Sequence, residues 1–83
     1  MELADRVKKT ASLFNDNIKL LKGVELSDEE MDIVELAKMY CSDSESFARK
    51  GDQITAFSAI EYAHGLLDAV LRIKGKDPYE SNK

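Results

Sequence analysis

The sequence is poor in cysteine, proline and glycine, and each shortage excludes a class of protein. Its single cysteine, Cys41, cannot form an intrachain disulfide or a zinc site built from several cysteines. One proline and four glycines argue against collagen-like and turn-rich all-β organisation. No apolar run approaches the roughly 18 residues that span a bilayer, and the first residues lack the pattern of a secretory signal. We therefore expect a cytoplasmic protein with no membrane partner.

Basic residues are outnumbered by acidic ones, which bears on the kind of partner. Twelve Lys and Arg stand against sixteen Asp and Glu, and the net charge is −4. Residues 1–22 hold five basic and three acidic side chains, whereas residues 25–50 hold three basic and eight acidic ones. We interpret this asymmetry as attraction between neighbouring helices. A nucleic-acid footprint on residues 1–22 is the disfavoured alternative, because no aromatic residues are interleaved with the lysines on their face.

A helical periodicity dominates the rest of the pattern. The chain has 83 residues, of which 43% are hydrophobic and 34% charged, the balance of one globular domain. Apolar residues recur at spacings of three and four over residues 3–22, 27–50 and 53–74, which predicts three amphipathic helices. We expect the bundle domain to occupy residues 1–75, followed by a flexible C-terminal tail over residues 76–83.

The second predicted helix carries the clearest local signals. Ser27 and Glu30 have the spacing of a capping box, and Met31 is expected in the core, paired with Leu26 in a hydrophobic staple. We expect Cys41 to be a buried, unreactive thiol. The apolar seam of this helix includes a stripe of small side chains, which lets a neighbouring helix approach closely: Ala37, Cys41, Ser44 and Ala48.

The joint before the third predicted helix is short. Gly51 can end one helix in the left-handed conformation, and Asp52 can cap the next at once, which forces a tight antiparallel hairpin. The third helix is apolar around most of its circumference, as suits a helix packed against two others with surface left for a partner. The predicted fold class is therefore all-α, an up-and-down three-helix bundle, and its small core makes dimerisation an expectation.

One segment of the chain carries a family resemblance. The Gly51-Asp52 joint and the run Tyr62–Ala69 resemble the signature of an archaeal family of small proteins, domain-of-unknown-function family 357. That signature is a glycine–aspartate joint followed by an aromatic-x-His-Gly-x-Leu-Asp-Ala run, and Ala37–Tyr40 and Phe47 also match the family pattern. The first predicted helix matches only in general character. The resemblance implies a left-twisted three-helix bundle and an archaeal source, and it implies no activity.

The only histidine, His64, lies at the centre of the predicted site. On a helix, Glu61 three residues before it and Asp68 four residues after it share its face. Gly65 lies beside them, where glycine costs about 1 kcal/mol relative to alanine in mid-helix but leaves room for close approach. Tyr62 flanks the group. As a hypothesis, we predict that these five residues form a binding surface.

Three other interpretations of these residues stay open at this point. Glu61 and His64 match one arm of the Glu-x-x-His motif of di-iron bundles, and a homodimer would have to supply the second arm. His64 tuned by Asp68 is a possible acid–base catalyst, although no nucleophile lies in a recognisable motif. In the simplest interpretation, His64 is a rim residue hydrogen-bonded to Asp68 or a neighbouring helix, and Gly65 only permits close helix packing within the bundle or across a dimer.

The leading prediction for function is a non-enzymatic protein-interaction or self-association module. Its partner would be another protein or a second copy of the chain, and we predict no catalytic residue and no cofactor. The alternative is a small enzyme or metal-binding subunit that uses the face formed by Glu61, His64 and Asp68.

Overall fold

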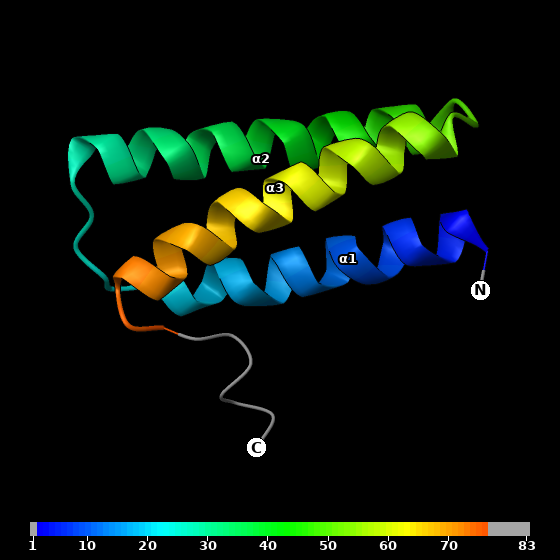
Figure 1. Cartoon of the computed structure of the whole chain (residues 1–83). Coiled ribbons are helices and arrows are strands. Elements are labelled where there is room, and N and C mark those ends of the chain that lie inside the picture. Colours follow the sequence, from blue (N-terminus) through cyan, green and yellow to red (C-terminus); the bar gives the residue numbers. More distant parts are fainter. Residues whose placement is uncertain (1, 77–83) are drawn as a thin grey trace, which may run out of the picture.

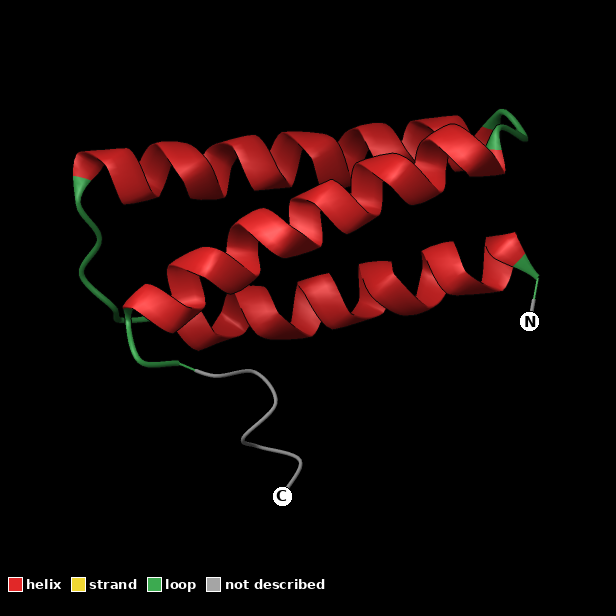
Figure 2. Ribbon diagram, viewed as in Figure 1, coloured by secondary structure: helices red, strands yellow, loops and turns green. Residues whose placement is uncertain are grey.

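Three long helices account for most of the protein in the computed structural model, which describes residues 2–76 (Figure 2). They are α1 (Leu3–Ile18), which continues into a short 3-10 helix η1 (Lys19–Leu21), α2 (Asp28–Arg49) and α3 (Gln53–Ile73). The described range contains no strand. The all-α class and the three helices are therefore confirmed.

The observed helix bounds differ from the predicted ones mainly at the end of the first helix. There the chain tightens into the 3-10 helix at residues 19–21, and Gly23 then adopts a positive φ of 76°. The tail predicted for residues 76–83 lies, apart from Lys76, outside the described residues. The left-handed twist implied by the family resemblance stays a prediction.

Helix α3 lies between the other two and organises the bundle (Figure 1). It packs extensively against α2 and against α1, whereas α1 and α2 contact each other little. The chain runs up, down and up again, so α1 and α3 point the same way and α2 is antiparallel to both. This central position explains why α3 is apolar around most of its circumference.

The start of α2 forms by the local interactions that the sequence predicts. The Glu30 backbone N–H donates to Ser27 Oγ at 3.1 Å, and the Ser27 backbone N–H donates to Glu30 Oε1 at 2.8 Å, which completes the capping box. Lys74, just after α3, places its Nζ 2.8 Å from the same Glu30 oxygen. One carboxylate therefore caps α2 and joins it to the end of α3.

The joint between α2 and α3 also follows its sequence signals. Gly51 takes a positive φ of 87°, and its N–H donates to the Ala48 carbonyl at 3.0 Å. Asp52 then caps α3, because its Oδ1 accepts the Thr55 N–H at 3.1 Å. Hydrogen bonds from Thr55 hold the pKa of Asp52 below its ordinary value.

Small side chains bring α2 and α3 close together. Ala37 and Ser44 of α2 are buried, as are Ala56 and Ala63 of α3. The Ser44 hydroxyl donates to the Ala56 carbonyl at 2.7 Å inside this contact, which satisfies the one buried polar side chain of the core. Cys41 lies in the same stripe, and burial raises the pKa of its thiol, as expected for an unreactive cysteine.

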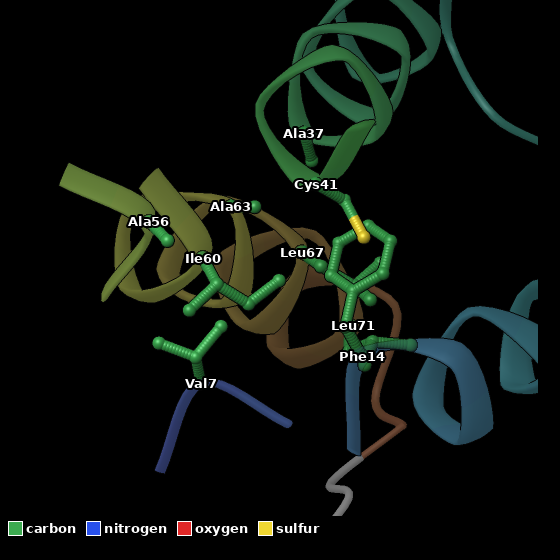
Figure 3. Packing of buried hydrophobic residues seen from close by; sticks show 9 residues of the cluster. All are labelled: Val7, Phe14, Ala37, Cys41, Ala56, Ile60, Ala63, Leu67 and Leu71. Carbon is green, nitrogen blue, oxygen red and sulfur yellow. The ribbon is translucent and has the colours of Figure 1, made fainter. Parts of the chain in front are cut away.

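The larger core residues come from α1 and α3. Val7 lies beside Ile60, and the Phe14 ring lies next to the Cys41 sulfur (Figure 3). The prediction of Met31 as a core residue is wrong, because its side chain is 48% exposed. Met31 lies at the rim where the end of α1 faces the start of α2, and these two helices pack too loosely to cover it.

The acid dependence of stability provides a test of the Glu30 contacts. The Lys74 ammonium and the Ser27 N–H hold the pKa of Glu30 below its ordinary value of 4.5. Ionised Glu30 therefore stabilises the fold above that value, and this stabilisation is lost as the pH falls through the lowered pKa. We expect Glu30→Gln, which can still cap α2, to melt a few degrees lower than wild type at neutral pH. The difference should vanish once the pH lies well below that lowered pKa.

The measurement is thermal unfolding, monitored by circular dichroism, from neutral pH down to a pH below the lowered pKa of Glu30. Glu29→Gln is the matched control, because it makes the same charge change in the same turn without touching the capping box or the ion pair with Lys74. A pH profile for Glu30→Gln that runs parallel to that of wild type would contradict the assignment.

Candidate functional site on helix α3

The five residues predicted as a binding surface all lie on α3 outside its buried stripe. Glu61, Tyr62 and Gly65 are exposed, and His64 and Asp68 are half-buried. Their side chains do not converge on one point, however. The structure divides them between the side of α3 that faces α1, the side that faces α2, and the outer surface.

Glu61 is turned toward α1. Its Oε1 accepts a hydrogen bond from the Thr10 hydroxyl at 2.9 Å. The two residues are 51 positions apart in the chain, so this contact is a tertiary one that the sequence pattern could not reveal. It engages one oxygen of the carboxylate that the metal-binding alternative requires.

Asp68 and His64 contain the two unsatisfied polar atoms of the site. Asp68 Oδ2 accepts from Arg72 Nε at 3.0 Å, one helical turn later. Asp68 Oδ1 and His64 Nδ1 are buried and have no hydrogen-bond partner among the described residues. The expected hydrogen bond between the two side chains is therefore not made through these atoms. An unpaired buried polar atom costs about 1–3 kcal/mol, so both atoms favour any partner that reaches them.

Nothing among the described residues requires a glycine at position 65. It is exposed on a regular helix, and it is not among the glycines with positive φ. A Cβ atom built at this position meets nothing within 4 Å. The expectation that Gly65 permits close packing inside the bundle is therefore wrong, because this position faces away from both neighbouring helices.

Tyr62 is turned toward α2, away from His64. Its ring packs edge-on against Tyr40, with centroids 4.7 Å apart and an interplanar angle of 83°. The pair forms one wall of a surface groove of about 410 Å³ between α2 and α3, whose lining includes Asp43, Phe47, Thr55 and Ser58. We call this the aromatic groove.

The α2 side of the aromatic groove was missed as a site by reasoning from sequence. From the sequence, Tyr40 and Phe47 stand out only as matches to the family pattern, and Asp43 does not stand out at all. Their spacing of three and four residues places all three on one helical face, which is the signal that could have found them. That spacing does not say which neighbouring helix completes the groove.

The described residues offer no metal centre and no membrane span. Over residues 2–76, no group of three or more His, Cys, Asp and Glu side chains could hold a metal ion. Glu61 and His64 thus lack further ligands in this part of the chain. None of its helices has the length and hydrophobicity to cross a bilayer.

These features define a small all-α protein with a capped helical hairpin and an exposed glycine on its central helix. A profile for proteins of unknown function, DUF357, matches residues 9–75, which is most of α1 and all of α2 and α3. Because the match covers more than half of the chain, the protein belongs to the DUF357 family. The predicted resemblance is confirmed and extends into the first helix. No curated protein matches the sequence significantly.

Gly65 yields a stability prediction. If nothing in the chain needs a glycine there, Gly65→Ala should stabilise the folded monomer by up to about 1 kcal/mol and raise its melting temperature by several degrees. The measurement is thermal unfolding at low protein concentration, where association contributes least.

Ala69→Gly is the matched control, since Ala69 is exposed one turn further along α3. The reverse exchange there should lower the stability by a similar amount. A destabilised Gly65→Ala monomer would show that Gly65 is needed for the fold itself.

Proposed function

We propose that this protein is a non-enzymatic interaction module that associates through the exposed side of α3. We define the Gly65 face as the exposed residues that follow one side of this helix: Ser58, Tyr62, Gly65, Ala69 and Ile73. The observation that carries the proposal is the empty space around Gly65, where a helix-weakening residue has no packing role in its own chain.

The composition of the Gly65 face suits contact with another helix. Ser58, Gly65 and Ala69 are small, so a partner backbone can approach closely along their line. Tyr62 and Ile73 are large and are 50% and 68% exposed, which supplies apolar area that water contacts in the free chain. Small residues between larger apolar ones are also how α2 and α3 pack inside the bundle.

A second copy of the chain is the partner that we propose first, because it presents the same line of small residues between larger apolar ones. Two antiparallel copies of α3 would bring these lines into contact with each other. A bundle of this size also gains stability when it buries further apolar surface. We therefore propose an antiparallel homodimer as the first form of association to test.

The enzyme and metal-binding alternatives gain no support from the geometry. Glu61 Oε1 and Asp68 Oδ2 accept hydrogen bonds from Thr10 and Arg72, and within residues 2–76 no group of three potential ligands gathers around them. An archaeal source and a cytoplasmic location, which the resemblance and the composition imply, belong to the same proposal and rest on the sequence alone.

The experiment is light scattering behind size exclusion, with wild type compared with Gly65→Leu. We expect the wild type to have twice the mass of one chain at high concentration, and the variant to be a folded monomer. Ser12→Leu is the matched control, because it adds the same side chain to an exposed position of α1 and should leave the dimer intact. Circular dichroism confirms that each variant is folded.

Two results would contradict the proposal. A dimer that survives Gly65→Leu unchanged would place the interface elsewhere. If the wild type is monomeric at every concentration, capture of partners from the source organism follows, with Gly65→Leu as the comparison. Identical captured proteins for wild type and Gly65→Leu would then exclude the Gly65 face as the contact.

A further inference from the structure

We propose that the aromatic groove binds a basic side chain, of the lysine type, presented by a polypeptide partner. The proposal rests on the lining of this groove and not on self-association, although Ser58 and Tyr62 border both surfaces. It names a ligand chemistry that the family match does not supply.

The groove is lined by residues 40–47 of α2 and residues 55–62 of α3. These two helices form the antiparallel hairpin of Figure 1. Helix α2 contributes Tyr40, Asp43 and Phe47 from one face, and α3 contributes Tyr62 from the opposing side. The edge-on contact of the two tyrosine rings holds the wall in place. The volume of about 410 Å³ lies within the range of ligand-binding pockets.

The lining combines aromatic rings with a carboxylate. Ring faces carry negative electrostatic potential and attract cations, most strongly where water is partly excluded. Asp43 is exposed at the groove and adds a full negative charge, and the Thr55 and Ser58 hydroxyls can accept hydrogen bonds from an ammonium group. A cation with an apolar stem satisfies both parts of such a lining.

The absence of a basic side chain sets the aromatic groove apart from its neighbours. None of its lining residues is a lysine or an arginine. Three other grooves of about 270–320 Å³ each contain at least one, represented by Lys22, Lys9 and Lys38. Each of those grooves has a basic side chain of the protein beside its acidic one. In the aromatic groove no lysine or arginine is among the lining residues beside Asp43, and Lys50 meets the groove only at the Phe47 ring.

The chain itself shows that one of these rings receives a cation. Lys50 Nζ lies 5.8 Å from the centroid of the Phe47 ring, within the distance of a cation–π contact. Tyr40 and Tyr62 offer the same kind of attraction to an ammonium group in the groove, with Asp43 as an additional acceptor.

The open shape of the groove favours a side chain over a free small molecule. The groove is open to solvent, so it would leave part of its ligand uncovered. A lysine on a polypeptide can lie there with its methylene stem along Phe47 and Tyr62 and its ammonium at Asp43, while the rest of the partner covers the other side. A free amine would lack that cover.

The test is an NMR titration of the labelled protein with blocked lysine, and with blocked norleucine as its uncharged counterpart. We expect lysine to shift the amide signals of residues 40–47 and 55–62, and to bind at least about three-fold more tightly than norleucine. Putrescine serves as the free-amine probe and should bind more weakly than lysine placed in a short peptide.

Matched variants separate the groove from general attraction to an acidic protein. Asp43→Asn should weaken lysine binding by about three-fold to ten-fold. Asp32→Asn makes the same charge change at an exposed position of α2 outside the groove and should have no effect. Tyr62→Leu keeps apolar bulk but removes the ring, and should also weaken binding, with circular dichroism confirming the fold.

Four results would overturn the proposal. Equal binding of lysine and norleucine would make this an apolar groove without charge selectivity. If Asp43→Asn and Asp32→Asn weaken lysine binding equally, the binding depends on the net charge of the protein and not on the groove. Tighter binding of putrescine than of the lysine peptide would exclude a polypeptide ligand. An absence of shifts in the groove would remove the site altogether. None of these results depends on whether Gly65→Leu changes the mass of the protein.

Discussion

The close approach of α2 to α3 is the constraint on which the rest of the structure depends. It is possible because alanine, serine and cysteine replace larger residues along the contact, and because the Ser44 hydroxyl finds the Ala56 carbonyl at 2.7 Å. A larger side chain in this stripe would push the helices apart, since protein cores have little free volume. The short Gly51-Asp52 joint requires the same proximity, so the turn and the stripe support one geometry.

This hairpin leaves α1 to cover what remains of α3. Val7 and Phe14 close the core from that side, while α1 and α2 contact each other little. The central helix is therefore buried on the sides that face its two neighbours and exposed on a third. The Gly65 face and the aromatic groove both follow from this arrangement, because one is the uncovered side of α3 and the other is the outer edge of its contact with α2.

The residues of the family signature have two different structural roles. Its leucine, Leu67, is fully buried and serves the fold, as does the buried Ala63 inside the same run. Its glycine has no packing role in the chain, and its histidine and aspartate carry buried atoms without partners. The first group explains why the bundle forms. The second group lowers the stability of a lone monomer, because a mid-helix glycine and unpaired buried polar atoms both cost free energy. A contact with a partner would offset that cost.

The sequence by itself determined what depends on neighbours within one or two helical turns. The capping box at Ser27, the Gly51-Asp52 joint, the three helices and the small-residue stripe could all be predicted, because short-range geometry decides them. Only the tertiary structure decided that Glu61 meets Thr10 and that Tyr62 meets Tyr40. It also decided that Met31 is left about half exposed and that Gly65 has no described residue packed over it. Those outcomes depend on how each helix is rotated and offset against the next, which helical periodicity leaves open.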